Sequence, residues 1–346
     1  MSHIALLGAG SWGTALAIVL ADNGHHVKIW ARRPEHAEEI NRQHTNEKYL
    51  PNIALPKNIQ ADSTMSEVVA GAQTIILVTP TKSIREVLNM LNKELKHPVS
   101  IIHASKGIEP DSLKRISEII EEEIDARYLK SIVALSGPSH AEEVGLRQPT
   151  TVTVSSTDKQ ACEAAQDLFI NEYFRVYTNE DIIGVELGGA LKNIIALGAG
   201  ICNGLGYGDN TRAALITRGL AEITRLGKKM GANPLTFSGL TGIGDLIVTC
   251  TSKHSRNWRA GFALGQGKTL NEVLNSMGMA VEGVRTTMAA YQLAEKYAVD
   301  MPITTELYNV LFNHKSAKQA VDDLMRRERT HEVEDLTAML QHKEKK

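Results

Sequence analysis

The sequence has few cysteines and no cluster of metal-ligating residues. Its 346 residues include three cysteines, Cys162, Cys202 and Cys250, which lie far apart. This spacing excludes a disulfide framework and a CxxC redox motif, and the histidines show no ligand spacing among themselves or with the cysteines. We therefore expect buried, reduced thiols, no bound metal and a cytoplasmic location.

The sequence also lacks an excess of charge of one sign. Lys and Arg number 38 against 40 Asp and Glu, for a net charge of −2, so the composition does not favour nucleic acid as a partner. We find no apolar run long enough to cross a bilayer and, because a strand begins at once, no room for a signal peptide. We predict a soluble globular protein, not a membrane protein, large enough for two domains.

The first 33 residues carry the pattern around which the chain is organised. An apolar run at 4–7 has the length and branching of a buried parallel strand. It ends in the sequence GAGSWG at 8–13, after which residues 14–21 are typical of a helix and residues 27–30 of a second strand. A strand, a glycine turn, a helix and a second strand form the unit that binds dinucleotides.

Each glycine of this turn has a distinct expected role. Gly8 makes the tight turn, Gly10 lets the backbone approach a pyrophosphate, and Gly13 lets helix and strand pack closely. The pyrophosphate would lie at the helix N-terminus, where free N–H groups and the helix dipole favour an anion. An ordinary glycine-rich turn is the alternative, but the position between a strand and a helix favours dinucleotide binding.

The residues after the second strand indicate which dinucleotide is preferred. An NAD-binding unit usually places Asp or Glu there for the ribose 2′-OH, whereas this chain has Arg32 and Arg33. Two guanidinium groups suit a 2′-phosphate, and no carboxylate stands there to repel it. A solvated basic turn before Pro34 is the alternative. We predict NADP(H) as the preferred cofactor, with NAD(H) possible.

Strands and helices continue to alternate as far as residue 180. Beyond a helix at 35–46, residues up to 66 are polar and irregular. Apolar runs then predict strands at 74–79, 100–104, 132–135 and 174–177, an antiparallel or edge strand at 150–155, and helices at 84–95 and 113–124. This alternation predicts an α/β Rossmann-type fold, a doubly wound and mostly parallel sheet with right-handed crossovers.

The pattern changes near 178–181, and the rest of the chain shows no convincing strand. Helical spacing of apolar residues predicts helices at 182–205, 211–230, 258–264, 286–297, 303–312 and 317–325. We therefore predict three segments: a dinucleotide-binding domain at 1–180, an all-α C-terminal domain at 181–340, and a charged tail at 341–346.

Polar residues follow two of the predicted strands. In an open α/β sheet, ligands bind beyond the carboxyl ends of the strands. Lys106 and the turn from Gly137 to Ala141 both stand at such ends. A lysine there is usually a solvated turn residue, but its place on the binding edge favours a ligand contact. Ser139 and nearby backbone N–H groups offer hydrogen bonds to hydroxyls or an anion.

The helical domain opens on a glycine-rich segment that contains a lysine. Five glycines between Gly188 and Gly204 each cost about 1 kcal/mol against alanine, which points to close approach of helices, backbone or ligand. Lys192 is a cation within this nearly apolar segment. It is either a lysine that snorkels to the domain edge or a catalytic lysine whose pKa is lowered by burial and by a neighbouring cation.

Two further segments supply polar groups. Asp245 follows a glycine turn and could hold a lysine ammonium. The segment TCTSKHSRN at 249–257 combines hydroxyls, an amide and cationic side chains before a predicted helix N-terminus at Trp258. That combination suits a phosphate monoester, whereas the alternative is a solvated loop.

These motifs together resemble the bacterial NAD(P)-dependent sn-glycerol-3-phosphate dehydrogenases over essentially the whole chain. The resemblance rests on GAGSWGTA at 8–15, SKG at 105–107, SGPSHA at 136–141, GALKNIIA and GLGYGDN between 189 and 210, GIGD at 242–245 and SRN at 255–257. The stretch from 189 to 210 is the most specific. It separates this family from ketopantoate reductases and 6-phosphogluconate dehydrogenases, which share the two-domain plan.

The resemblance implies reversible hydride transfer between NADPH and dihydroxyacetone phosphate, giving sn-glycerol 3-phosphate for phospholipid synthesis. Lys192 is then the proton acceptor in oxidation, and Asp245 orients it or balances its charge. The implied substrate-binding residues are Lys106, Gly137, Ser139, Lys192, Asp245, Ser255, Arg256 and Asn257. The implied cofactor-binding residues are Gly8, Gly10, Ser11, Trp12, Gly13, Arg32, Arg33, Lys106, Ala141, Arg256, Val281 and Glu282.

The residue patterns and the family resemblance both predict that the substrate lies in a cleft between the two domains. The family plan also suggests a homodimer through the helical domain. Two other functions are compatible with parts of the pattern. A two-domain hydroxy-acid dehydrogenase could use the same lysine but would need a carboxylate site in place of the phosphate cluster. A non-catalytic NADP(H)-binding protein would bind the cofactor and show no turnover.

Overall fold

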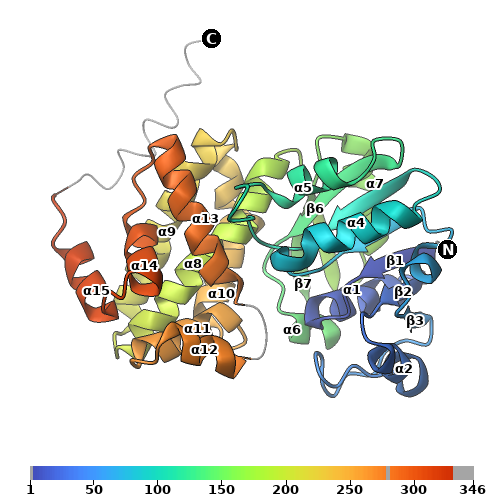
Figure 1. The fold of residues 1–346 in the computed structure, drawn as a ribbon, viewed down its shortest axis with the longest axis horizontal. Helices are drawn as coiled ribbons and strands as arrows, with labels where there is room; N and C mark the ends of the chain where they lie inside the picture. Colours follow the sequence, from blue (N-terminus) through green and yellow to red (C-terminus); the bar gives the residue numbers. More distant parts are fainter. Residues whose placement is uncertain (1–2, 278–280, 330–346) are drawn as a thin grey trace, which may run out of the picture. The chain divides into compact units, whose positions relative to one another are not determined.

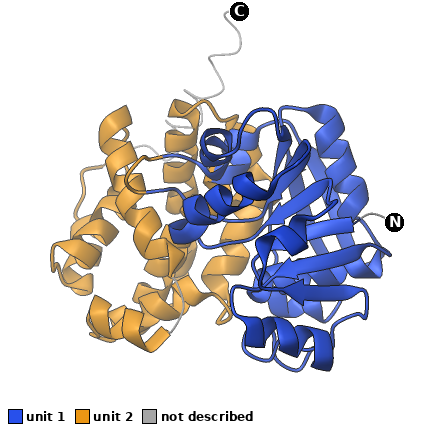
Figure 2. Ribbon diagram, turned by 45° about the vertical axis from the view of Figure 1, so that its right-hand side comes forward, with its two compact units in different colours: residues 1–109, 114–186 blue, residues 110–113, 187–346 orange. Residues whose placement is uncertain are grey.

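The computed structural model describes residues 3–277 and 281–329. It divides into two compact units, residues 1–109 with 114–186, and residues 110–113 with 187–346 (Figure 2). The division at Glu186 falls six residues after the predicted domain boundary at 180, and it lies inside a helix. The predicted charged tail at 341–346 lies outside the described residues.

Unit 1 is built on one eight-stranded sheet with the strand order β3-β2-β1-β4-β5-β6-β7-β8 (Figure 1). Neighbouring strands run parallel except for β6 and β7, which are antiparallel. The predicted doubly wound, mostly parallel sheet is confirmed. Its strands are β1 (His3–Leu7), β2 (His26–Trp30), β3 (Ile59–Asp62), β4 (Thr74–Leu77), β5 (Val99–His103), β6 (Leu129–Ser136), β7 (Thr150–Ser155) and β8 (Phe174–Asn179).

The first strand explains why its sequence is continuously apolar. Ile4 and Leu6 pack into the core on one face of the sheet, and Ala5 and Leu7 pack into the core on the other face. A strand covered on both faces cannot alternate with polar residues. The predicted buried parallel strand is thus confirmed by the two separate cores that it joins.

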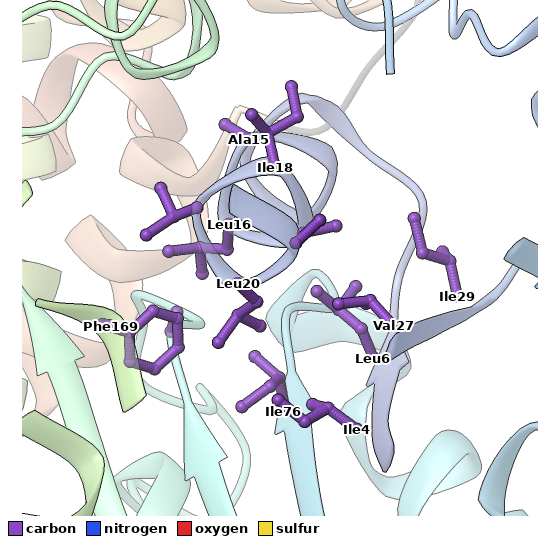
Figure 3. Packing of buried hydrophobic residues seen from close by; sticks show 14 of the residues in the cluster. Ile4, Leu6, Ala15, Leu16, Ile18, Leu20, Val27, Ile29, Ile76 and Phe169 are labelled. Atoms are coloured by element: carbon purple, nitrogen blue, oxygen red, sulfur yellow. The ribbon is translucent and has the colours of Figure 1, made fainter. Parts of the chain in front are cut away.

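Helices cover both faces of this sheet. Helix α1 (Ser11–Asp22) contributes Leu16 and Leu20 to the core with Ile4 and Leu6, as Figure 3 shows. The other helices of unit 1 are α2 (Pro34–Gln43), α3 (Met65–Val69), α4 (Ile84–Glu94), α5 (Ile116–Glu123), α6 (Ala141–Gly145) and α7 (Lys159–Phe169), and α8 (Ile182–Gly204) begins there.

Some predicted elements of unit 1 need correction. Residues 47–66 are not uniformly irregular, because strand β3 (Ile59–Asp62) pairs with β2 at the sheet edge. Its sequence IQAD is short and half exposed, so it has no apolar run to detect. The strand β7 (Thr150–Ser155) is antiparallel to β6, as predicted, but it is not at the edge, since β8 pairs with it on its other side.

The described residues of unit 2 form helices joined by loops and no strand, which confirms the predicted all-α second domain. Beyond the rest of α8, it contains the α-helices α9 (Asp209–Lys229), α10 (Asp245–Thr251), α11 (Arg256–Gly265), α12 (Leu270–Met277), α13 (Glu282–Tyr297), α14 (Pro302–Phe312) and α15 (Ala317–Met325). Sequence patterns missed α10 and α12. Both are short, and the apolar run of α10 shows no helical spacing.

The expectation that no apolar run could cross a membrane is wrong for α8. This helix has 23 residues, and its most apolar window has a mean hydropathy of 1.5, which is enough by length and composition. Glu186 and Lys192 interrupt the run in the sequence and hide its length. Within the structure 89% of that window is buried, so protein covers the apolar surface of this helix.

The glycines of α8 allow it to meet α11 backbone to backbone. A Cβ at Gly200 would lie 2.0 Å from the Trp258 carbonyl oxygen, and one at Gly261 would lie 2.0 Å from that of Leu197. Gly204 and Gly265 form the next contact of the same kind, with only 3.0 Å between a Gly204 Cβ and the Gly265 Cα. The predicted close approach is confirmed, and it fixes the start of α11 against the helix that carries Lys192.

Candidate functional site

The glycine turn has the geometry of a dinucleotide cradle. Gly8 has φ +125°, a conformation that L side chains rarely adopt, and a Cβ there would lie 2.4 Å from the Val78 carbonyl oxygen. A Cβ at Gly13 would lie 2.0 Å from the Gly8 carbonyl oxygen. At Gly10 a Cβ would meet nothing within 4 Å among the described residues. Two glycines therefore close the turn, and the third faces open space where a pyrophosphate could approach.

A buried asparagine that the sequence patterns did not identify holds this turn from behind. Asn46 is fully buried, and its amide donates to the Ala9 carbonyl oxygen at 3.1 Å and to Thr14 Oγ1 at 2.7 Å. The His36 ring supports its side-chain oxygen at 2.8 Å. An asparagine beyond the end of a short polar helix gives no signal in the sequence, because its partners are 32 and 37 residues away.

Two buried polar atoms in unit 1 fit the presence of a ligand. Trp12 Nε1, in the first turn of α1, and Thr79 Oγ1, just after β4, have no hydrogen-bond partner among the described residues. Native structures rarely leave such atoms unsatisfied without a functional reason. Arg32 and Arg33 follow β2 and are exposed. The glycine cradle, the unsatisfied donors and the exposed cations together fit a phosphorylated dinucleotide.

The lysine and the serine predicted at the strand ends lie together. Lys106, beyond β5, donates from Nζ to the Gly137 carbonyl oxygen at 3.1 Å, and Ser139 donates from Oγ to the same oxygen at 2.9 Å. Gly137 has φ +142°, and a Cβ there would lie 2.9 Å from Val152 Cα. The turn after β6 therefore requires glycine, and it brings a cation and a hydroxyl to one point. Ala141 follows as the first residue of α6.

Lys192 is buried and held by two oxygens. Its ammonium contacts Asp245 Oδ1 and donates to Thr249 Oγ1 at 2.8 Å. Lys192 is 7% exposed and Asp245 is fully buried, so the lysine does not snorkel to the surface. The charge beside it is a carboxylate, which favours the ammonium form. Thr249, one helical turn after Asp245, belongs to the segment predicted to bind phosphate, and its contact with Lys192 was not predicted.

An asparagine pair continues this cluster. Asn257 donates from Nδ2 to Asn193 Oδ1 at 2.8 Å and accepts from the Gly283 backbone N–H at 2.8 Å. This side chain therefore connects the residue after Lys192 to the residue after Glu282. The Cβ of an alanine at Gly283 would lie 2.7 Å from the Asn193 carbonyl oxygen. Asn193 and Gly283 belong to the candidate site, although neither was among the predicted residues.

Helix α11 begins within the predicted phosphate cluster, two residues earlier than expected. Ser255 is its N-cap, with Oγ accepting from the Trp258 N–H at 3.2 Å, and Arg256 is its first residue. Val281 and Glu282 stand at the start of α13. Of the predicted residues, the structure brings Lys106, Gly137 and Ser139 together in unit 1. In unit 2 it brings Lys192 to Asp245 and, through Asn193, connects the lysine segment to Asn257.

The cysteine side chains and the potential metal ligands of the described residues were predicted from their spacing. The three cysteines are free and buried, as predicted, and burial raises the pKa of the Cys250 thiol to about 12. Across residues 3–277 and 281–329, no three His, Cys, Asp or Glu side chains are grouped in a way that could hold a metal ion.

Family models match both parts of the chain. The model for the N-terminus of NAD-dependent glycerol-3-phosphate dehydrogenase matches residues 3–162, and the model for its C-terminus matches residues 181–322. The chain belongs to the NAD-dependent glycerol-3-phosphate dehydrogenase family. It is therefore an enzyme, an oxidoreductase that uses NAD(P).

Individual relatives agree with this family. The glycerol-3-phosphate dehydrogenase [NAD(P)+] of Lysinibacillus sphaericus (strain C3-41) is 64% identical over 97% of this chain and 99% of its own length. The crystal structure of glycerol-3-phosphate dehydrogenase from Coxiella burnetii has a TM-score of 0.90 at 38% identity, covering 94% of this chain and 99% of that one.

A ketopantoate reductase from Ralstonia eutropha JMP134 aligns over 93% of this chain and 99% of its own, with a TM-score of 0.59 at 14% identity. That likeness shows the fold alone.

Proposed function

We propose that this chain catalyses reversible hydride transfer between NADPH and dihydroxyacetone phosphate, giving sn-glycerol 3-phosphate. The observation that supports this most strongly is Lys192, a buried ammonium bound to Asp245 and Thr249 and linked through Asn193 to the helix that begins at Arg256. A proton donor next to a site suited to a phosphate monoester matches a phosphorylated ketone as substrate.

In this proposal Lys192 protonates the ketone oxygen during reduction and accepts the proton during oxidation. Asp245 stabilises the ammonium and fixes its direction, and Thr249 holds the same nitrogen from a second side. Because Thr249 also donates to the Asp245 backbone oxygen at 2.6 Å, its hydroxyl oxygen is turned toward the lysine. Bound NADPH would supply the hydride.

The substrate phosphate would be held at the start of α11. Arg256, the first residue of this ten-residue helix, offers a guanidinium fork, and the first N–H groups of the helix are further donors for an anion. Ser255 and Asn257 would add donors, but each also has a structural bond, so we assign them partly to positioning. Lys106, Gly137 and Ser139 complete the proposed substrate contacts.

The proposed cofactor contacts are the glycine turn with Ser11 and Trp12, the pair Arg32 and Arg33, and Lys106, Ala141, Arg256, Val281 and Glu282. Arg32 and Arg33 would bind the 2′-phosphate, which makes NADP(H) the preferred cofactor and leaves NAD(H) usable. Hydride transfer requires direct contact between nicotinamide and substrate, and the two sets of proposed contacts accordingly share Lys106 and Arg256.

We further propose a cytoplasmic enzyme that supplies glycerol 3-phosphate for phospholipids, acts on small molecules and not on nucleic acid or in a membrane, and forms a homodimer. The near-neutral net charge of −2 supports the exclusion of nucleic acid as a partner, because it offers no excess of positive charge for a polyanion. Burial of α8 supports a place for this apolar helix inside the protein.

The deciding experiment follows nicotinamide absorbance with purified protein, dihydroxyacetone phosphate, and NADPH or NADH in parallel. We expect oxidation of both, faster with NADPH. In the double variant Arg32→Ala/Arg33→Ala the KM for NADPH should rise by about tenfold or more while that for NADH changes little. Folded protein that binds NADPH but shows no oxidation would overturn the proposed reaction, and equal effects on both cofactors would overturn the arginine assignment.

A further inference from the structure

Glu186 is a buried carboxylate for which the mechanism above has no use. It lies in the second turn of α8, is the last residue of unit 1, and its side chain is 3% exposed. Buried carboxylates are rare unless they are paired, and an unpaired one costs several kcal/mol. The charge of Glu186 is therefore expected to have partners that it holds in place.

Four groups of unit 1 converge on this carboxylate. Ser117 donates to it twice, from its backbone N–H at 2.7 Å and from Oγ at 2.6 Å. The Arg115 guanidinium contacts Oε2, and His103 Nε2 lies 3.2 Å from Oε1. Arg115 and Ser117 are at the start of α5, and His103 is the last residue of β5. One side chain thus joins α8 to a helix and to a strand end.

Charge and hydrogen bonding keep this carboxylate ionised. Burial by itself would raise the pKa of the Glu186 carboxyl, but the contacts with His103 and Arg115 and the Ser117 hydroxyl outweigh burial, and the net shift of the pKa is downward. A charged acceptor makes stronger hydrogen bonds than a neutral one. Replacing it by an amide would therefore weaken all four contacts at once.

Each of the two lysines of the proposed reaction is close in sequence to an element that Glu186 joins. Lys106 follows His103 by three residues, and Lys192 follows Glu186 by six residues within the same uninterrupted helix. Six residues span about 9 Å of a helix, a stiff connection. We propose that Glu186 is a positioning residue for the reaction: it fixes the rotation and height of α8 at the end of β5, and thereby the direction in which the helix presents Lys192.

This inference rests on the proposed function, and a matched control separates it from a purely structural role. Glu222 is an equally buried carboxylate that binds a helix start in the same way, accepting from the Ile303 and Thr304 backbone N–H groups at 2.6 and 3.1 Å. It joins α9 to α14 and does not lie on α8 or β5. A general loss of a buried carboxyl group that holds a helix start should affect both variants alike.

The experiment compares Glu186→Gln with Glu222→Gln in full-length protein, with rates expressed per NADPH-binding site so that unfolded protein does not count. We expect kcat for dihydroxyacetone phosphate reduction to fall by about 10- to 100-fold in Glu186→Gln, since small misplacement of a reacting group costs that much. The dissociation constant for NADPH should change less than about twofold, and kcat of Glu222→Gln should stay within about twofold of wild type.

A milder variant keeps the test decisive if Glu186→Gln does not fold. Ser117→Ala removes the 2.6 Å bond from the hydroxyl to Glu186 and the 2.9 Å bond that this hydroxyl accepts from Arg115, while the backbone N–H bond to Glu186 stays. It should lower kcat by a smaller factor, about two- to fivefold, again with unchanged NADPH affinity. Equal kcat per binding site in wild type, the Glu186 or Ser117 variant and the Glu222 control would overturn the inference. Inactivity of wild type itself would instead overturn the proposed function, so the two failures are distinguishable.

Discussion

Lys192 illustrates how much a single residue depends on its surroundings. In isolation its side chain is a flexible cation, whereas here Asp245 and Thr249 fix its nitrogen in a nearly water-free position. A fixed ammonium can deliver a proton to one defined oxygen, which a solvated lysine cannot do. Asn193, the next residue, accepts a hydrogen bond from Asn257, which in turn accepts one from the Gly283 backbone N–H.

We predict that Lys192→Ala reduces turnover by about 10² to 10⁴ while NADPH affinity is retained, because the proton donor is lost and the glycine cradle is not touched. Steady-state kinetics and NADPH fluorescence titration measure the two quantities. Alanine leaves Asp245 buried without its cation, so Lys192→Arg serves as a second variant that keeps the charge and cannot release a proton at neutral pH. Near-normal turnover in either variant would contradict the assignment of Lys192 as the proton donor.

In the segment from β1 through α1, the glycines that the fold requires and the glycine expected to meet the cofactor stand within one short turn. Gly8 and Gly13 are required by the backbone itself, since a Cβ on either would overlap a carbonyl oxygen, whereas Gly10 is not. Binding and folding therefore depend on different glycines of one six-residue turn.

A matched pair of substitutions tests this division. Gly13→Ala should destabilise the protein strongly, by about 3 kcal/mol or more, because its Cβ would lie 2.0 Å from the Gly8 oxygen. Gly10→Ala should remain folded with a melting temperature close to that of wild type, yet bind NADPH at least about tenfold more weakly. Thermal unfolding and fluorescence titration measure both, and unchanged NADPH affinity in a folded Gly10→Ala protein would argue against pyrophosphate binding at this turn.

At the scale of the whole molecule, a second buried carboxylate makes stability depend on pH. Burial raises the pKa of Glu222 to about 7, even though hydrogen bonds from Ile303 and Thr304 lower it. The folded state thus binds this proton more tightly than the unfolded state does. Between about pH 4.5 and pH 7, stability from this group falls as pH rises, by an amount on the order of 3 kcal/mol.

Glu222→Gln should remove this contribution, because an amide does not titrate. We expect the melting temperature of the variant, relative to wild type, to increase as pH rises from about 5 to 7.5, by roughly a few degrees. The exposed residue Glu163 supplies a matched control in Glu163→Gln, whose difference from wild type should stay flat over that range. A difference that decreases with rising pH would show that the pKa of Glu222 is not raised.

Features with local causes could be predicted from the amino-acid sequence. The buried run at 4–7, the glycine spacing at 8–13 and the amphipathic helices are patterns of neighbouring residues, and the structure confirms the sheet, α1 and the all-α second unit. The specific motif around Lys192 was sufficient to indicate the family, to which the matched family models assign the chain.

Features whose causes lie far apart in the chain became apparent only in the folded protein. Strand β3 exists because β2 pairs with it, and Asn46 supports the glycine turn through partners more than 30 residues away. The carboxylate beside Lys192 comes from 53 residues further along, and the one at Ser117 from 69 residues further. Hydrogen bonds and buried charges act between atoms within about 3 Å, so their partners follow from the folded path and not from spacing in the sequence.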